Sequence, residues 1–196
     1  MSAAEVIILA GPSGAGKTRL ADRLGWPVVR LDDFYRDHDD PALPRLADGL
    51  VDWDDPRSWR QADAMGVLEQ LCSGGACEVP DYDISQSRQV GTHQLDAGGS
   101  AYVVAEGIFA HHLVEELRNR DLLLEAICVT QPPVVTFIRR LTRDLREKRK
   151  SARVLISRGL RLMRQQPRVV ADARAHGARP MSAREAEVLL EQLTRP

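Results

Sequence analysis

The sequence predicts an α/β fold in which a parallel sheet is flanked by helices. Short apolar runs without polar alternation, such as residues 6–10, are typical of strands that are buried on both faces. These runs alternate with helical patterns, which is how parallel strands are connected. A glycine-rich turn joins the first run to the first helix. With 196 residues, 43% of them hydrophobic, and a net charge of −1, we expect a single domain over residues 1–196.

The chain opens with a strand, a turn and a helix. Residues 6–10 read Val-Ile-Ile-Leu-Ala, and the run after the glycine-rich turn is compatible with a helix over 17–24. A second short β-rich run covers residues 28–31. Residues 36–59 are rich in Asp and Pro, which predicts a loop that contains a short helix.

The middle of the chain predicts a helix, a hairpin and a strand. Apolar residues three and four positions apart predict a helix over 61–71. Residues 78–94 form two extended arms around a polar turn. After two adjacent glycines, the apolar run 101–105 predicts a third buried strand.

The last part repeats the alternation. We expect a helix over 108–117 and a fourth strand over 123–129. Pro132 and Pro133 begin a long helical stretch, because proline is tolerated in a first helical turn. Residues 177–181 predict a turn or short strand, and a capping-box pattern precedes a final helix over 183–193.

Composition excludes several classes of protein. The longest apolar stretch is too short to span a bilayer, and no secretory leader precedes it, so we expect a cytoplasmic protein with no membrane partner. The near-zero net charge provides no general attraction to nucleic acid. We therefore expect a small-molecule partner and no nucleic-acid partner, and the sequence leaves a homo-oligomer open.

Cysteine and histidine residues show no metal-binding spacing. Cys72, Cys77 and Cys128 lie outside CxxC or Cys/His spacing, so thiols in a reducing compartment are expected rather than disulfides or a zinc site. His111 and His112 are adjacent rather than four residues apart, which favours packed or surface roles.

The glycine-rich turn matches the phosphate-binding pattern G-x-x-x-x-G-K-[ST] over residues 11–18. Glycines allow successive N–H groups to surround phosphate oxygens, and the following helix adds its positive N-terminal end. The lysine supplies a charge to the β- and γ-phosphates, and the threonine offers a hydroxyl to Mg²⁺. The candidate nucleotide-binding residues are Gly11, Ser13, Gly14, Ala15, Gly16, Lys17 and Thr18.

Acidic residues follow two of the predicted strands. In open parallel sheets, ligands bind at the carboxyl ends of the strands. Asp32 and Asp33 follow residues 28–31, and only one of two adjacent side chains on an extended segment should face the site. That carboxylate orients an acceptor hydroxyl, takes its proton or holds the metal, unless both residues solvate a loop or cap a helix. Glu106 follows the third strand and is a candidate for the Mg²⁺ shell, with a helix cap as the alternative.

Separated segments resemble, in order, the uridine kinase group of P-loop nucleoside kinases, which also includes phosphoribulokinase and bacterial pantothenate kinase. Leu-Asp-Asp-Phe-Tyr-Arg at 31–36 resembles the family pattern D-S-F-Y, and Asp-Trp-Asp-Asp-Pro at 52–56 resembles N-F-D-H-P. Residues 80–88 resemble the hairpin pattern P-x-Y-D-F…H-S-R, and Val-Ala-Glu-Gly-Ile at 104–108 resembles E-G-I. Residues 139–150 resemble the lid pattern R-R-x-x-R-D…E-R-G-R. The resemblance implies a P-loop NTPase fold, with an acceptor-side insertion of about 34–97 that carries a β-hairpin and a basic helical lid of about 139–166.

The resemblance also implies the roles of individual residues. ATP donates a phosphoryl group to a hydroxyl of a nucleoside, such as uridine or cytidine, or of a similar metabolite. Lys17 and the catalytic base Asp32 act together with the lid arginines Arg140 and Arg143. Mg²⁺ is held by Thr18, with Asp32 or Glu106. The acceptor-side residues are Asp54, which is expected at the ribose hydroxyls, Tyr82, Arg88 and Glu106.

The chain departs from the family pattern at two places. Gln86 stands about where the family has a base-recognising histidine, and Lys148 and Lys150 replace lid arginines. A lysine cannot bind a phosphate in the forked manner of arginine. An alternative function is a P-loop nucleotide-binding regulator or NTPase without a small acceptor. The alternative for the basic stretch is a solvated helix face or a nucleic-acid patch.

Overall fold

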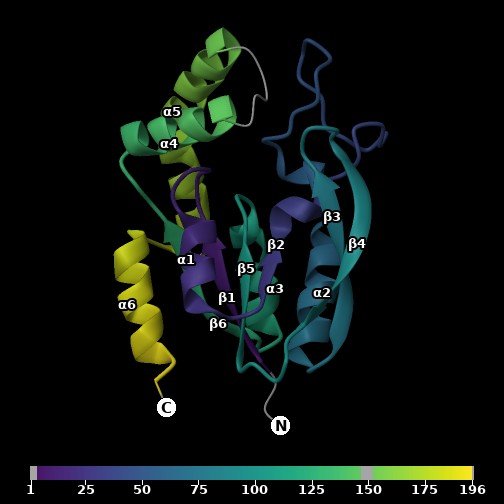
Figure 1. Cartoon of the computed structure of the whole chain (residues 1–196), viewed down its shortest axis with the longest axis vertical. Coiled ribbons are helices and arrows are strands. Elements are labelled where there is room, and N and C mark those ends of the chain that lie inside the picture. The colour runs from purple at the N-terminus through teal and green to yellow at the C-terminus, as the bar shows by residue number, and fades with distance from the viewer. Residues whose placement is uncertain (1–3, 147–151, 196) are drawn as a thin grey trace.

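The computed structural model describes residues 4–146 and 152–195 and contains a five-stranded parallel sheet (Figure 1). The strand order is β2-β5-β1-β6-β7, and every described strand pair in this sheet is parallel. The strands are β1 (Glu5–Ala10), β2 (Val28–Arg30), β5 (Tyr102–Glu106), β6 (Leu123–Val129) and β7 (Arg179–Met181). Because β1 lies between β5 and β6, the turn after β1 opens where the chain order reverses, which is where open α/β sheets bind ligands.

The central strand β1 is buried on both faces, as its uninterrupted apolar sequence predicts. Val6 and Ile8 belong to one core cluster, whereas Ile7 and Leu9 belong to the other, and all four are completely buried. Successive side chains of a strand point to opposite faces, so one apolar run supplies two cores.

Helices cover both faces of the sheet. One layer consists of α1 (Lys17–Leu24) and α6 (Ala183–Leu193), which contribute Leu20 and Leu190 to their core cluster. The helices packed in the other cluster are α2 (Gln61–Cys72), α3 (Val114–Asn119) and α5 (Ala152–Ala175). The helix α4 (Pro133–Arg146) packs mainly against α5, and both rise beside the carboxyl edge of the sheet in Figure 1.

A separate two-stranded hairpin lies beyond the β2 edge of the sheet. Its antiparallel strands are β3 (Ala76–Asp83) and β4 (Arg88–Asp96), and Val79 lies opposite His93. Val79 is buried in the core cluster that contains α2, so the base of the hairpin is anchored in the body of the protein. The described connection from Arg36 to Trp59 contains one short 3₁₀ turn, Pro56–Ser58, as its composition predicts.

Two predicted boundaries need correction. The strand predicted over 28–31 ends at Arg30, and a 3₁₀ turn, Leu31–Phe34, carries the two aspartates. The helix predicted over 108–117 is a 3₁₀ turn, Ala110–Leu113, followed by α3. In both places the buried apolar residues are correctly identified, but tertiary packing selects a tighter turn than periodicity indicates. Residues 177–181 do contain a strand, because β7 pairs with β6.

The three cysteines are buried free thiols. Cys72, Cys77 and Cys128 have at most 4% of their surface exposed. Burial raises the pKa of Cys72 and of Cys128 to about 11 and also raises the pKa of Cys77. None of the described helices combines the length and the apolar character that crossing a membrane requires.

Candidate active site

The phosphate loop, residues 11–18, joins β1 to α1 at the carboxyl edge of the sheet. Gly11 has φ +127°, and a Cβ at this position would lie 2.4 Å from the carbonyl oxygen of Val129. Only glycine fits both the backbone conformation and the contact with β6. The turn between Gly11 and Lys17, the first residue of α1, consists of Pro12 and the predicted loop residues Ser13, Gly14, Ala15 and Gly16.

Lys17 places its ammonium group inside this loop. The residue is only 8% exposed, and Nζ donates to the carbonyl oxygens of Gly11 at 2.9 Å and Pro12 at 3.3 Å. The buried positive charge lies at the N-terminus of α1, where the helix dipole also favours an anion. Together they provide the electrostatics for a polyphosphate.

Thr18 and Glu106 meet at the end of β5. The hydroxyl of Thr18 donates to Oε1 of Glu106 at 2.8 Å, and Glu106 is 8% exposed. Burial raises the pKa of Glu106, although the nearby Lys17 charge and the Thr18 hydrogen bond oppose this effect. Neighbouring oxygen ligands of octahedral Mg²⁺ are about 3 Å apart, so this hydroxyl–carboxylate pair has the donor type and spacing that Mg²⁺ requires.

The two adjacent aspartates face different surroundings. Oδ1 of Asp32 is 3.6 Å from the position that a Cβ on Gly107 would occupy, and the charge of Asp32 acts on Glu106. Asp33 instead accepts a hydrogen bond from the backbone N–H of Tyr82, and burial raises its pKa to about 6. The carboxylate of Asp32 therefore lies toward the phosphate-loop side, and that of Asp33 lies toward the hairpin. The two residues belong to a 3₁₀ turn, whereas the sequence predicts an extended segment.

Aromatic rings join the segments that were predicted to form the acceptor side. The ring centroid of Tyr35 is 5.9 Å from Trp53, 6.0 Å from Tyr82 and 6.1 Å from Phe109. These rings come from the 31–36 segment, the 52–56 loop, the hairpin and the turn after β5, respectively. Tyr35 and Phe109 were not among the predicted site residues, because their importance depends on long-range packing. The predicted residue Asp54 follows Trp53 directly and is exposed.

The hairpin residues occupy two different environments. The hydroxyl of Tyr82 donates to the carbonyl oxygen of Arg36 at 2.9 Å, and burial raises its pKa to about 12. This bond ties the hairpin to the 31–36 segment. Arg88 is exposed at the start of β4, opposite Asp83. Gln86 donates to Asp83 at 2.6 Å within the turn between the strands.

The first turns of α4 pack over the phosphate loop. A Cβ on Gly14 would lie 2.9 Å from the carbonyl oxygen of Thr136, and Nη1 of Arg139 is 3.7 Å from the position of a Gly16 Cβ. Arg139 was not among the predicted catalytic arginines, although its place in the basic stretch was recognised. Arg140 and Arg143 belong to α4, but their side chains lie outside the described part of the structure.

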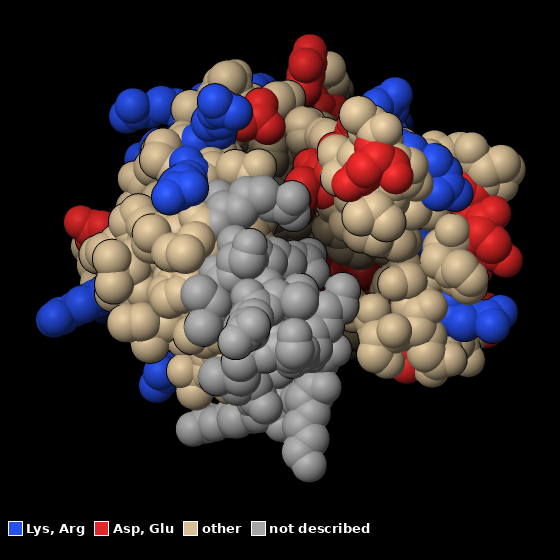
Figure 2. All heavy atoms as spheres, turned by 90° about the horizontal axis from the view of Figure 1, so that it is seen from above, with Lys and Arg blue, Asp and Glu red and all other residues tan. Residues whose placement is uncertain are grey.

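A cavity of about 790 Å³ separates β2 from the hairpin. Its lining includes the carboxylates of Asp22, Asp33, Asp81 and Asp83, together with Arg30 and His93. Seen from above in Figure 2, the molecule has a hollow with Asp and Glu side chains at its margin. The acidic lining favours ligands that carry hydroxyl groups over ligands that carry additional phosphate.

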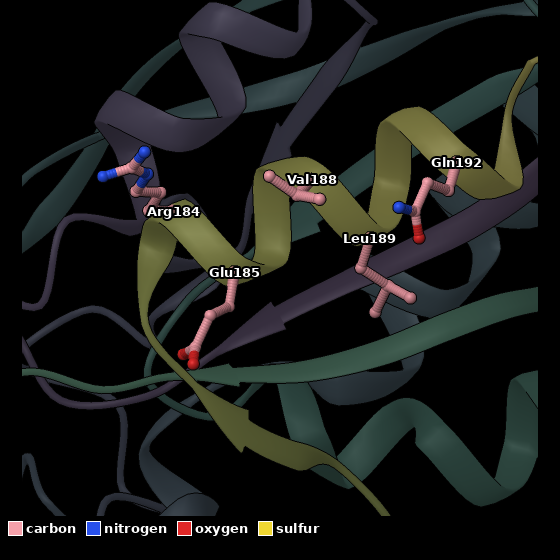
Figure 3. A pocket seen from close by; sticks show the side chains of 5 residues that line it. All are labelled: Arg184, Glu185, Val188, Leu189 and Gln192. Atoms are coloured by element: carbon pink, nitrogen blue, oxygen red, sulfur yellow. The ribbon is translucent and has the colours of Figure 1, made fainter.

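Two other hollows contain none of the predicted site residues. One of about 680 Å³ lies between the end of β6 and α5, with Thr130 and Val170 in its lining. The other, of about 320 Å³, runs along α6 (Figure 3). It is lined by Arg184, Glu185, Val188, Leu189 and Gln192. Because these five side chains come from one helix, this hollow is a surface feature of α6.

Comparisons with known proteins identify related sequences. A uridine kinase of Deinococcus deserti is 34% identical over 166 residues, which make up 81% of this chain and 77% of that protein. The inorganic pyrophosphatase TTM2 of Arabidopsis thaliana is 36% identical over 142 residues, but this match covers only 19% of the plant protein. The activity of that larger protein is therefore not transferred to this chain.

A solved structure and a family model complete the comparison. The crystal structure of a candidate fructose transport system kinase from Silicibacter sp. TM1040 has a TM-score of 0.62 at 18% identity, covering 93% of this chain and 89% of that chain, which shows a shared fold. The model of the Phosphoribulokinase / Uridine kinase family matches residues 6–171. With its phosphate loop intact and most of its length matched, the chain belongs to this family of ATP-dependent P-loop kinases.

Proposed function

We propose that this kinase transfers the γ-phosphoryl group of ATP to a hydroxyl group of a nucleoside or a similar uncharged, hydroxylated metabolite in the cytoplasm. The observation that carries the proposal is the meeting of three groups at one sheet edge. These are the Lys17 ammonium group in its loop, the Thr18–Glu106 pair and the carboxylate of Asp32. A nucleotide-binding regulator needs the Lys17 ammonium group and the Thr18–Glu106 pair to bind its nucleotide. It does not need the carboxylate of Asp32, because it has no acceptor hydroxyl to deprotonate.

The residues divide the work of the reaction. Asp32 accepts the proton of the acceptor hydroxyl, whose oxygen forms a bond to the γ-phosphorus while the bond to the bridging oxygen of ADP breaks. Lys17 and the phosphate-loop amides bind the phosphates and hold the reacting group in position. Thr18 and Glu106 would hold Mg²⁺, which supplies positive charge to the phosphates.

The lid residues complete the proposal. Arg140 and Arg143 neutralise charge on the transferring group, and Arg139 adds a further guanidinium beside the loop. Closure of the residue 139–166 region would exclude water, which otherwise competes as the acceptor.

The acceptor side supports an uncharged, ring-bearing acceptor. Tyr35, Trp53 and Tyr82 offer ring faces, and Asp54 adds an exposed carboxylate for hydroxyl groups. Four aspartates in the neighbouring cavity disfavour an acceptor that already carries a phosphate. Gln86 and Arg88 lie at the turn end of the hairpin, and we assign them a part in selecting among acceptors.

The decisive experiment measures ADP release from ATP with and without candidate acceptors. The panel contains nucleosides, free pentoses, a pentose monophosphate and pantothenate. Release that is stimulated by an uncharged member supports the proposal, with the phosphorylated product identified by mass spectrometry. Release that is the same with every acceptor and without any acceptor would favour an NTPase instead. Stimulation by the pentose monophosphate alone would contradict the proposed acceptor class.

A further inference from the structure

Three histidines converge on the side of the protein where α5 ends. His111 and His112 belong to the 3₁₀ turn after β5, and His176 directly follows α5. The ring centroids are 4.3 Å apart for His111 and His112, 4.6 Å for His112 and His176, and 5.2 Å for His111 and His176. One ring nitrogen from each residue lies within 4.8 Å of the others. The adjacent positions of His111 and His112 in the sequence favour packed or surface roles, and the fold adds His176 to them.

Asp172 adds a carboxylate to the three imidazoles. Its Oδ2 atom is 2.9 Å from Nε2 of His111 and 3.9 Å from Nε2 of His112, and its Oδ1 atom is 3.5 Å from Nδ1 of His176. Ligand atoms about 2.1 Å from a tetrahedral ion are about 3.4 Å from one another. The observed separations bracket this value, so small rotations of the side chains would complete a four-ligand set.

Two of the histidines have buried nitrogen atoms without a hydrogen-bond partner among the described residues. These atoms are Nδ1 of His111 and Nε2 of His112. A buried polar atom that lacks a partner costs free energy, and a cation bound at Nε2 of His112, the nitrogen that faces Asp172, would remove that cost; His111 faces Asp172 with its other nitrogen, Nε2.

We propose that His111, His112, His176 and Asp172 form a binding site for a divalent transition-metal ion of the zinc type, separate from the Mg²⁺ site at Thr18 and Glu106. Three imidazoles and one carboxylate are ligands that suit Zn²⁺ and related ions, whereas Mg²⁺ prefers oxygen ligands throughout. The exposed fraction of the side chains rises from 2% in His111 to 51% in Asp172, so the ion can enter from solvent.

The position of the site gives it a structural consequence. The metal would link the turn that follows β5 to the end of α5. The strand β5 carries Glu106, and α5 begins within the lid region. A metal held by both elements stabilises the folded chain, because the unfolded chain does not hold these ligands together.

The test uses the full chain without an affinity tag and after treatment with a chelator. Zn²⁺ is titrated against a chromogenic chelator, and Co²⁺ is added separately to record its visible absorption. We expect one equivalent of Zn²⁺ to bind, Co²⁺ to give the intense visible bands of a tetrahedral site, and the melting temperature to rise with Zn²⁺. His176→Ala and His112→Gln should each weaken Zn²⁺ binding at least ~10-fold, because each removes a ligand.

The matched control is His38→Ala, which removes an exposed histidine from the 36–59 loop. This variant should bind Zn²⁺ as the parent chain does. His176 is partly exposed, so His176→Ala should remain folded, which circular dichroism checks. Two results would overturn the site: no stoichiometric binding by the folded parent chain, or unchanged affinity in folded His176→Ala and His112→Gln.

Discussion

At the scale of single residues, two neighbouring acids in this protein have different surroundings. Asp32 and Asp33 are adjacent in sequence, yet Asp32 acts electrostatically on Glu106 whereas Asp33 accepts a hydrogen bond from the hairpin backbone. A 3₁₀ turn separates the two side chains. Asp32→Asn and Asp33→Asn each remove one carboxylate, so a comparison of the two variants distinguishes an effect on catalysis from an effect on stability.

We expect Asp32→Asn to lower kcat at least ~10²-fold, because an amide cannot accept the proton of the acceptor hydroxyl. The KM for ATP should change little, since the phosphates bind to the loop and not to this carboxylate. Steady-state ADP release at varied ATP and acceptor measures both parameters. Asp39→Asn is the matched control, because Asp39 is an exposed acid in the neighbouring loop. A normal kcat in Asp32→Asn, together with a large loss in Asp33→Asn, would transfer the role of base to Asp33.

Asp33 also predicts a pH dependence of stability. Its pKa is about 6 in the folded protein and 3.8 ordinarily, so the folded state binds the proton more tightly. This contribution to stability is fully present below pH 3.8 and is lost as the pH rises through about 6. Asp33→Asn should therefore raise the free energy of unfolding at pH 7 by about 1–2 kcal/mol, after allowance for solvent screening. Urea unfolding at several pH values measures this, and an equal gain at every pH would contradict it.

At the scale of elements, the phosphate loop, α4 and α5 form one connected series. Gly14 in the loop packs against the carbonyl of Thr136 in the first turn of α4. The hydroxyl of Thr136 donates to Gln166 of α5 at 2.7 Å, and Gln166 in turn donates to the carbonyl of Gln131 at 2.7 Å. The phosphate loop is therefore linked to both helices by direct contacts.

The hairpin is attached to the same edge by the Tyr82–Arg36 hydrogen bond. Tyr82→Phe should lower the free energy of unfolding by about 0.5–1.5 kcal/mol, the usual net value of one hydrogen bond. It should also raise the KM for the acceptor more than the KM for ATP, because the hairpin borders the acceptor side only. Tyr102→Phe, in β5, provides a control for loss of a tyrosine hydroxyl elsewhere. Equal changes in both KM values would argue against this division.

At the scale of the whole molecule, the sequence predicts the central sheet well and the site only in part. Residues 6–10 predict β1 because the strand is buried on both faces, and the phosphate-loop pattern locates Lys17 and Thr18 because all of its determinants are local. The position of Arg139 beside Gly16 and the cluster around His176 could not be predicted, since each depends on distant segments packing together. Local patterns carry no information about such contacts.

Ligand binding should stabilise the entire fold. A non-hydrolysable ATP analogue with Mg²⁺ at 100 times its Kd adds about 2.7 kcal/mol, or roughly 5–10 °C in Tm for a protein of this size. Lys17→Met should lose most of this shift, whereas Arg19→Met, an exposed basic residue of the same helix, should retain it. Differential scanning fluorimetry with and without EDTA records the effect of removing Mg²⁺. A full shift in Lys17→Met would contradict the role of its ammonium group.

The buried cysteines make the folded protein resistant to thiol-alkylating reagents. Only the thiolate reacts quickly, and burial both excludes the reagent and keeps Cys72 and Cys128 protonated. Modification by iodoacetamide at neutral pH should therefore proceed in proportion to the fraction of molecules in which each site is open, and mass spectrometry of the labelled peptides over time would measure that fraction. Rapid labelling of all three sites under native conditions would contradict this expectation. The native thiols thus serve as internal probes of breathing motions, with one on α2, one on the hairpin and one on the strand that contacts the phosphate loop.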